Sequence, residues 1–214
     1  MPQIPTCQAL DAMSTLRSLE DLRSLYAEPT VRVLRKEVTA IDHHIEKFVA
    51  LSPFVVIASG SEQLHLDASP RGGEPGFVQV VDAHTLLIPD APGNNRLDTL
   101  QNILATSQVS LLFFVPGVDE MLRIHGTAEL RTDPSLLTRF AHQARPPKLV
   151  IQVTLRGAYL HCAKAMMRSR LWAPESRVDR SVLPSMGQMI KDHAQLDTPA
   201  ETHDEMLKRY AQDL

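Results

Sequence analysis

The feature that most constrains the fold of this chain is a series of short runs of β-branched and other apolar residues, joined by brief polar connections. The first run, "FVVIAS" (54–59), is bounded by Pro53 and Gly60, as buried strands often are. Five further runs have the same character: "GFVQVV" (76–81), "HTLLI" (84–88), "VSLLFFV" (109–115), "EMLRIHGTAEL" (120–130) and "KLVIQVTLRGAYLH" (148–161). Because these runs come in clusters and do not alternate regularly with helices, they predict an antiparallel sheet or barrel with added helices.

Helical spacing appears before, between and after these runs. Leucines spaced every three residues predict a helix over roughly 9–27, which Pro29 ends. Apolar residues from Thr30 to Phe48 recur at steps of four and three, which predicts one amphipathic helix ending at 52–53. In "NRLDTLQNILA" (95–105), Leu97, Leu100 and Leu104 predict another helical stripe, with Ile103 beside it. We expect residues 173–198 to be mostly irregular and a short helix to begin near Pro199.

The loop within "PDAPGNNRLDTL" (89–100) connects a predicted strand to a predicted helix. Asn95 is a good N-cap residue, and Asp98 lies three places later, near the position of a capping-box acid. Free N–H groups at a helix start favour negative charge, whereas Arg96 opposes the helix dipole unless an anion is also present. The loop is therefore a candidate anion site, although a capped surface helix with a solvated arginine also fits.

A second arginine-bearing loop is expected in "LDASPRGGEPGFV" (66–78). Ser69 and Arg71 offer a hydroxyl and a guanidinium, and the glycines at 72 and 73 allow close approach of the backbone to an anion. An ordinary hairpin loop that carries an arginine fits the same residues. Two such loops beside strands point to a phosphate-bearing ligand more strongly than either loop alone.

Familiar catalytic and phosphate motifs are absent from the sequence. It has no P-loop, no G-x-G-x-x-G, no G-x-S-x-G and no H-E-x-x-H. His43 and Glu46 lie three residues apart on a predicted helix, where a solvated surface is the expected role, and we expect no metal site. An enzyme whose cofactor carries the chemistry remains open, because such a protein need only bind and orient the cofactor.

Charge and composition narrow the class of protein. The 214 residues are 43% hydrophobic and 22% charged, as in globular proteins, and the net charge of −3 does not favour nucleic-acid binding. The sequence shows no apolar run of about 20 residues and no secretory signal pattern, so we expect no membrane insertion. Cys7 and Cys162 are isolated, which favours a reduced, cytoplasmic protein.

Several stretches together resemble the pyridoxamine 5'-phosphate oxidase-like family of FMN-binding split β-barrels. They are "SPF" with its following strand (52–59), "DASPRGGEPGFVQV" (67–80), "TLLIPDAPGNNRLDTLQNIL" (85–104), "VSLLFFVPGVDEMLRIHGTAEL" (109–130) and "HCAKAMMRSRLW" (161–172). The resemblance covers roughly residues 30–175. It implies a six-stranded antiparallel split barrel that forms a homodimer with FMN at the dimer interface. We expect a single domain over 1–214, with N-terminal helices in 1–52, the barrel in 53–165 and a C-terminal tail and helix in 166–214.

The resemblance also implies which residues bind FMN. For the phosphate and ribityl chain they are Ser69, Arg71, Ile88, Pro89, Asn94, Asn95 and Arg96. Backbone groups of Phe77, Val78, Gln79 and Val80 would line the flavin ring, with Met121 and Arg123 nearby. Lys164, Arg168, Arg170 and Trp172 would reach the partner subunit's FMN or substrate, or else Trp172 packs and the arginines stay solvated.

The sequence departs from the vitamin-producing oxidase of this family in two ways, and both affect which reaction is expected. Phe77 and Asp82 stand about where the vitamin-producing oxidase has basic residues, and that enzyme's C-terminal substrate signature is absent. The resemblance therefore implies an FMN-dependent oxidoreductase that acts on an unknown small molecule, in a branch other than the vitamin-producing oxidase. A non-catalytic flavin carrier or sensor, or a haem-binding split barrel, is the alternative.

Overall fold

The computed structural model describes residues 15–91 and 93–212. Contacts divide the chain into two compact units, Met1–Lys36 and Glu37–Leu214. In the first unit, α1 (Leu19–Leu25) begins at Ser18, whose side chain and that of Asp21 form a capping box. The predicted stripe therefore becomes a shorter helix, and its first part lies outside the described residues. The single-domain organisation stays a prediction.

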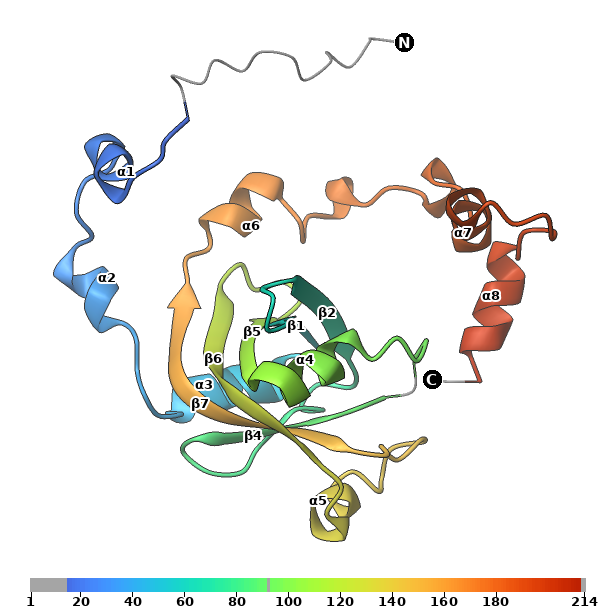
Figure 1. Ribbon diagram of the computed structural model, residues 1–214, viewed down its shortest axis with the longest axis horizontal. Helices are drawn as coiled ribbons and strands as arrows, with labels where there is room; N and C mark the ends of the chain where they lie inside the picture. The colour runs from blue at the N-terminus through green and yellow to red at the C-terminus, as the bar shows by residue number, and fades with distance from the viewer. Residues whose placement is uncertain (1–14, 92, 213–214) are drawn as a thin grey trace. The chain divides into compact units, whose positions relative to one another are not determined.

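An antiparallel sheet forms the body of the second unit (Figure 1). Its strands are β1 (Phe54–Gly60), β2 (Leu66–Gly72), β3 (Gln79–Val80), β4 (Thr85–Pro89), β5 (Gln108–Phe114), β6 (Met121–Arg131) and β7 (Val150–His161). They are ordered β2-β1-β5-β6-β7-β4-β3, and every neighbouring pair is antiparallel. The sheet is not closed, because no pairing within the described residues joins β2 to β3 or β4. The antiparallel class is confirmed.

The predicted strand number of six is wrong, because the described sheet has seven strands. The additional strand is β2, which the sequence presents as a loop rich in turn-forming residues. It pairs with β1 from Phe54↔Gly72 to Gly60↔Leu66. Pro70 is tolerated there because β2 is an edge strand, where a missing N–H breaks no ladder bond.

The predicted strand over 76–81 shrinks to the two residues of β3. A turn closed by the hydrogen bond from Phe77 N–H to Glu74 O (2.9 Å) precedes it, and Gly76 has a φ of +85°. Phe77 and Val78 enter the core instead of a strand ladder. The predicted hairpin turn at 82–83 is present, since Val81 N–H bonds to Thr85 O at 2.9 Å.

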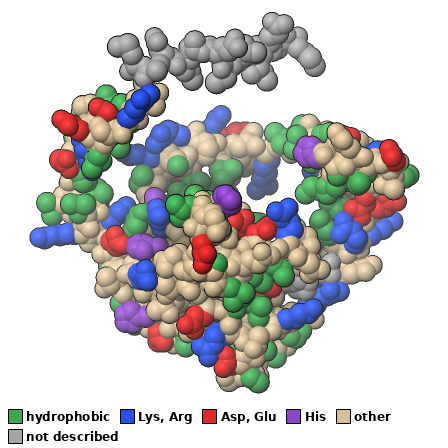
Figure 2. Space-filling view, in the orientation of Figure 1, with side chains coloured by type: hydrophobic (Ala, Val, Ile, Leu, Met, Phe, Trp, Pro, Cys, Tyr) green, Lys and Arg blue, Asp and Glu red, His purple; other side chains and the backbone are tan. Residues whose placement is uncertain are grey.

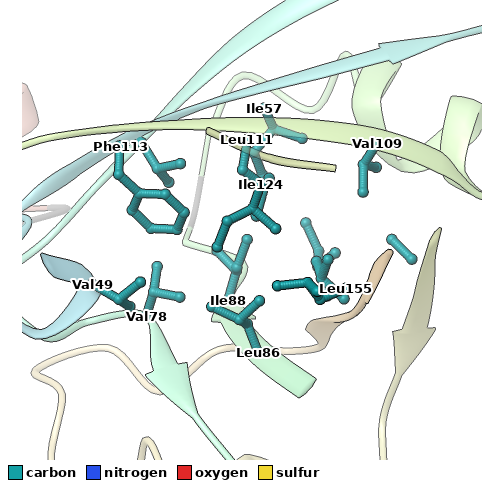
Figure 3. Close-up of a cluster of buried hydrophobic side chains, with 14 of the residues drawn as sticks. Val49, Ile57, Val78, Leu86, Ile88, Val109, Leu111, Phe113, Ile124 and Leu155 are labelled. Carbon is teal, nitrogen blue, oxygen red and sulfur yellow. The ribbon is translucent and has the colours of Figure 1, made fainter. Parts of the chain in front are cut away.

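Side chains from one face of the curved sheet meet in one main core (Figure 3). Ile57, Leu111 and Ile124 come from β1, β5 and β6 and are fully buried. They face Leu86 and Ile88 from β4 and further apolar groups from the β3 region and α3 (His43–Leu51). The alternation of buried and exposed residues along these strands is what the two-residue period predicts.

Strand β4 is buried on both of its faces. Leu86 and Ile88 point into the main core, whereas Leu87 joins Phe140 and Val150 in a smaller cluster. The segment around α5 (Pro134–Thr138) supplies Leu136 and Leu137 to this second cluster. The double burial explains the continuous apolar run of β4, because no position on it faces water freely.

The predicted single helix from Thr30 to the Ser52–Pro53 boundary is wrong. The structure has α2 (Val31–Arg35) in the first unit and α3 in the second. Between the helices, Val38 pairs with Ala158 of β7 through backbone hydrogen bonds of 2.9 and 2.8 Å. Asp42 then caps α3 by accepting bonds from the N–H groups of His44 and Ile45. Val38 therefore pairs with β7 as a strand residue does, although the spacing of apolar residues predicts a helix at this position.

Helix α4 (Asp98–Thr106) lies over β1 (Figure 1). Its buried residues are Thr99, Leu100 and Ile103, while Leu97 and Leu104 are exposed. The predicted stripe of Leu97, Leu100 and Leu104 is therefore only partly correct. The helix begins at Asp98, two residues later than the sequence suggests, so Leu97 lies outside it.

The C-terminal region contains more helix than predicted. After α6 (Lys164–Ser169), the 3₁₀ turns η1 (Pro174–Ser176) and η2 (Arg180–Val182) lead to α7 (Met186–Ala194). Ser185 caps α7 by accepting from Gln188 N–H, a cap that the prediction of an irregular 173–198 overlooked. Helix α8 (His203–Tyr210), predicted to start near Pro199, packs against α7 (Figure 1). Within the described ranges, no helix combines the length and apolarity needed to cross a bilayer.

Candidate anion-binding cavity

A cavity of about 890 Å³ lies where the two ends of the open sheet approach one another. Its walls come from β2, the end of β4, the start of α4 and the segment before β7. In the strand order, β2 is at one edge and β4 lies next to the other. The cavity therefore occupies the split of the barrel, and it contains both arginine-bearing stretches singled out in the sequence.

The start of α4 presents free backbone donors to this cavity. Leu97 is the N-cap residue, in the left-handed region at φ 62°, and its side chain makes no capping hydrogen bond. The prediction of Asn95 as N-cap is therefore wrong. The N–H groups of Asp98, Thr99 and Leu100 make no hydrogen bond to any residue in the described part of the chain. Helix α4 has nine residues, and the uncapped N–H groups at its start favour a negatively charged ligand.

Arg71 projects into the cavity from β2. One terminal nitrogen donates to Ser69 Oγ at 3.0 Å and to the Pro70 carbonyl at 2.8 Å. Its Nε is buried and has no acceptor within hydrogen-bonding distance among the described residues. A buried guanidinium donor without an acceptor costs free energy, so this atom is suited to an incoming oxyanion.

Arg96 contrasts with Arg71 because its side chain is 74% exposed. Its Nε donates to Asp98 Oδ2 at 2.8 Å, and this bond raises the pKa of Arg96 above its ordinary value. The backbone N–H of Arg96 donates to Asn94 Oδ1 at 3.0 Å, which holds the loop in place. Arg96 is thus a permanent cation at the cavity mouth.

Arg145 and Lys148 also line the cavity, and the sequence analysis did not select them. Both belong to "RPPK" (145–148), which lies just before β7. The register Pro89↔Val150 brings this segment beside the end of β4. Two basic residues around a Pro-Pro pair before a strand are a signal that could have been noticed, but their position depends on the pairing of β4 with β7.

Asp90 is a third charged residue of the cavity that the sequence analysis missed. Its Oδ1 lies 3.9 Å from Arg71 Nε, and its side chain is 22% exposed. Burial raises the pKa of Asp90, and the charge of Arg71 acts in the opposite direction. Around the described part of the cavity, Arg71, Arg96, Arg145 and Lys148 outnumber Asp90 and Asp98, so the cavity favours an anion.

The predicted site residues fall into three groups. The first group lines the cavity: Ser69, Arg71, Pro89, Asn94, Asn95 and Arg96. The second lies apart from the lining, with Phe77, Val78 and Ile88 buried in the main core, Val80 packed against it, and Gln79 bonded to Arg139. The third lies on β6 and in the α6 region: Met121, Arg123, Lys164, Arg168, Arg170 and Trp172.

The third group has its own local contacts. Arg123 donates to Tyr159 Oη at 3.2 Å, while its Nε is buried without an acceptor among the described residues. Trp172 Nε1 donates to Val118 O at 2.9 Å, and Arg170 lies 3.8 Å from Glu175. None of the third group lines the cavity. One chain therefore does not assemble the cavity and the α6 region into a single site within its described residues.

Comparison with known protein families shows to which family this chain belongs. The sequence profile of the family described as Pyridoxamine 5'-phosphate oxidase matches residues 41–162, which is more than half of the chain. The chain belongs to the pyridoxamine 5'-phosphate oxidase family. The matched range contains the whole sheet and every described lining residue of the cavity, whereas Lys164, Arg168, Arg170 and Trp172 lie beyond it.

Several solved structures are similar to this chain. HupZ from Group A Streptococcus is 15% identical with a TM-score of 0.46, over 56% of this chain and 93% of its own. A putative pyridoxamine 5'-phosphate oxidase from Lactobacillus delbrueckii is 17% identical with a TM-score of 0.45, over 57% and 99%. An FMN-binding protein from Syntrophomonas wolfei is 8% identical with a TM-score of 0.46, over 67% and 97%. No curated protein matches the chain.

Proposed function

We propose that this protein binds FMN in the cavity at the split of the barrel and acts as an FMN-dependent oxidoreductase on a small molecule. The proposal rests on one observation, which is that two sets of hydrogen-bond donors without acceptors belong to residues around the same cavity. Asp98, Thr99 and Leu100, whose N–H groups are uncapped, line the same cavity as Arg71, whose buried Nε has no acceptor among the described residues. Both are suited to the phosphate of a mononucleotide.

The size and charge of the cavity fit this ligand class. Its volume of about 890 Å³ lies within the range of about 300–1,000 Å³ typical of small-molecule sites. Arg71 and Arg96 would hold the phosphate, and the Ser69 hydroxyl and the Asn94 amide, which line the same cavity, would bond hydroxyls of the ribityl chain. When bound, FMN would supply hydride or electron transfer, which the described lining residues do not provide by themselves.

We also propose that the protein acts as a homodimer with FMN at the subunit interface. Support comes from the outer face of the sheet, where Phe54 pairs with Phe114 and Val56 with Leu112. Phe54 is 39% exposed, and the centroid of its ring lies 5.9 Å from that of Phe114. A second copy would cover these apolar side chains.

The exposed thiol of Cys162 fits a reducing, cytoplasmic setting.

Charge on the surface does not favour a polyanionic partner. Figure 2 shows Lys and Arg interspersed with Asp and Glu on the face drawn, with no single basic field. Nucleic acids are usually bound by concentrated basic surfaces, so a small anion in a local cationic cavity is the better ligand class.

The test is a visible absorption spectrum of purified protein after FMN has been added and the excess removed by desalting. We expect a retained two-band flavin spectrum. Absence of retained flavin would overturn the assignment of the cavity. Reduction of the bound flavin by a reduced nicotinamide, followed by reoxidation with an acceptor, would support the oxidoreductase; retained flavin that no donor reduces would favour a carrier or sensor.

A further inference from the structure

Asp90 occupies an unusual position in a cavity that favours anions. Its carboxylate faces Arg71 Nε at 3.9 Å, which is close enough for an ion pair but too long for a hydrogen bond. No side chain or backbone group in the described ranges donates a hydrogen bond to this carboxylate. The backbone of Asp90 is fixed separately, because its N–H donates to Leu149 O at 3.1 Å. The carboxylate is therefore held mainly by one cation.

Other charged residues line the same cavity as Asp90. They are Arg71 from β2, Arg96 and Asp98 from the start of α4, and Arg145 and Lys148 from the segment before β7. Arg96 already has Asp98 as a hydrogen-bonded partner. Arg71 is thus the cation that Asp90 neutralises most directly, and it is also the cation whose buried Nε lacks an acceptor.

We propose that Asp90 is a counter-ion that a phosphate-bearing ligand displaces from Arg71, and that the displaced carboxylate then binds a proton from solvent in a pH-dependent fraction of the molecules. This inference rests on the proposed function, since it concerns the same cavity. The phosphate oxygens accept from Arg71, and the proton binds to a carboxylate oxygen of Asp90. No covalent bond of the ligand changes.

Two effects of a bound phosphate act in the same direction on Asp90. The phosphate adds a negative charge near the carboxylate, and it takes over the Arg71 charge that favours ionisation. Burial already raises the pKa of Asp90 in the free protein. Binding should therefore raise the pKa of Asp90 further, and the complex should hold more protons than the free protein and ligand together.

The experiment is calorimetric titration of the full chain with FMN in two buffers of different ionisation enthalpy. At about pH 6, where the phosphate monoester itself titrates, the wild type should take up a fraction of a proton more than Asp90→Asn. The titration of the free ligand is common to both proteins, so the difference reports the Asp90 carboxylate together with the effect of its charge on the bound phosphate. At about pH 8, Asp90→Asn should bind FMN about 10-fold more tightly than wild type, because it removes a repelling charge.

Two further variants keep the test decisive. Asp133→Asn is the matched control, because Asp133 is also paired with an arginine, Arg131 at 2.8 Å, but lies outside the cavity lining. It should show the proton uptake of the wild type. Asp90→Ala provides a second removal of the carboxylate and leaves the N–H bond to Leu149 in place.

The two proposals fail in different ways. Equal proton counts for wild type and both Asp90 variants, with FMN bound in each, would overturn the displacement and leave FMN binding intact. A wild-type protein that binds neither FMN nor inorganic phosphate would overturn the proposed function and this inference together.

Discussion

Arg71 Nε and Asp90 Oδ1 lie 3.9 Å apart although their strands are far apart in the strand order. Arg71 belongs to the edge strand β2, and Asp90 directly follows β4 near the other edge. At the level of Asp90, β3 no longer covers β4, since β3 pairs only with Leu86 and Leu87. The ion pair therefore spans the split of the barrel and forms one wall of the cavity.

Replacement of Arg96 should weaken FMN binding without unfolding the protein. A hydrogen bond to a charged group contributes about 1.5–3 kcal/mol, so Arg96→Ala should raise the dissociation constant about 10- to 100-fold. Arg96 is mostly exposed, so the unfolding midpoint should stay close to that of wild type. Arg156→Ala is the control, because Arg156 is exposed on β7 and outside the cavity. Flavin fluorescence titration of both variants measures the effect, and full occupancy in Arg96→Ala would remove Arg96 from the site.

The stability of the free protein should depend on the charge of Asp90. Burial raises its pKa in the folded state above the ordinary value of 3.8, so its contribution to stability is complete below that pH. The contribution is lost as the pH rises through the folded-state pKa. Urea unfolding of wild type and Asp90→Asn at several pH values should show the wild type losing stability relative to the variant from acid toward neutral pH. The opposite trend would mean that attraction to Arg71 exceeds the cost of burial.

A side chain at Gly126 should destabilise the sheet. Gly126 lies at the irregularity between β6 and β7, and an added Cβ would overlap the carbonyl oxygen of Thr154. Gly126→Ala should lower the free energy of unfolding by at least about 2 kcal/mol, because backbone atoms would have to move. Gly93→Ala is the matched control, since nothing lies within 4 Å of its added Cβ. Similar unfolding midpoints for the two variants would contradict the close approach.

The buried face of α4 can be checked with two neighbouring residues. Ile103 is 2% exposed and packs in the main core, whereas Leu104 is 74% exposed. Ile103→Ala should lower the free energy of unfolding by about 2–5 kcal/mol. Leu104→Ala should change it by no more than about 0.5 kcal/mol. Chemical denaturation of both proteins tests this, and a larger loss for Leu104→Ala would restore the leucine stripe predicted from the sequence.

Local patterns predicted the strands that the core needs. β1, β5 and β6 alternate between buried and exposed positions, and the family resemblance follows from the order of such runs. The patterns failed where pairing between distant segments decides the structure. Val38 leaves a helical period to pair with Ala158, and β2 forms from a stretch that reads as a loop.

The cavity could be predicted only in part for the same reason. Arg71 and Arg96 stood out because each lies among turn-forming residues that expose a guanidinium. Their presence in one cavity depends on the ends of the open sheet approaching each other, as do the positions of Asp90 and Lys148. Such proximity follows from strand register, which no local pattern encodes.

Pro70 has a consequence for the behaviour of this protein at high concentration. It lies in the middle of β2, whose outer edge pairs with no described strand. An uncovered edge of seven residues offers a template for strands of other molecules, and edge-to-edge pairing of this kind leads to aggregation. Because proline lacks an N–H group, Pro70 removes a donor from the centre of that template. The neighbouring charges of Asp67 and Arg71 discourage a foreign strand further, so the strand that carries Arg71 into the cavity is also protected against self-association.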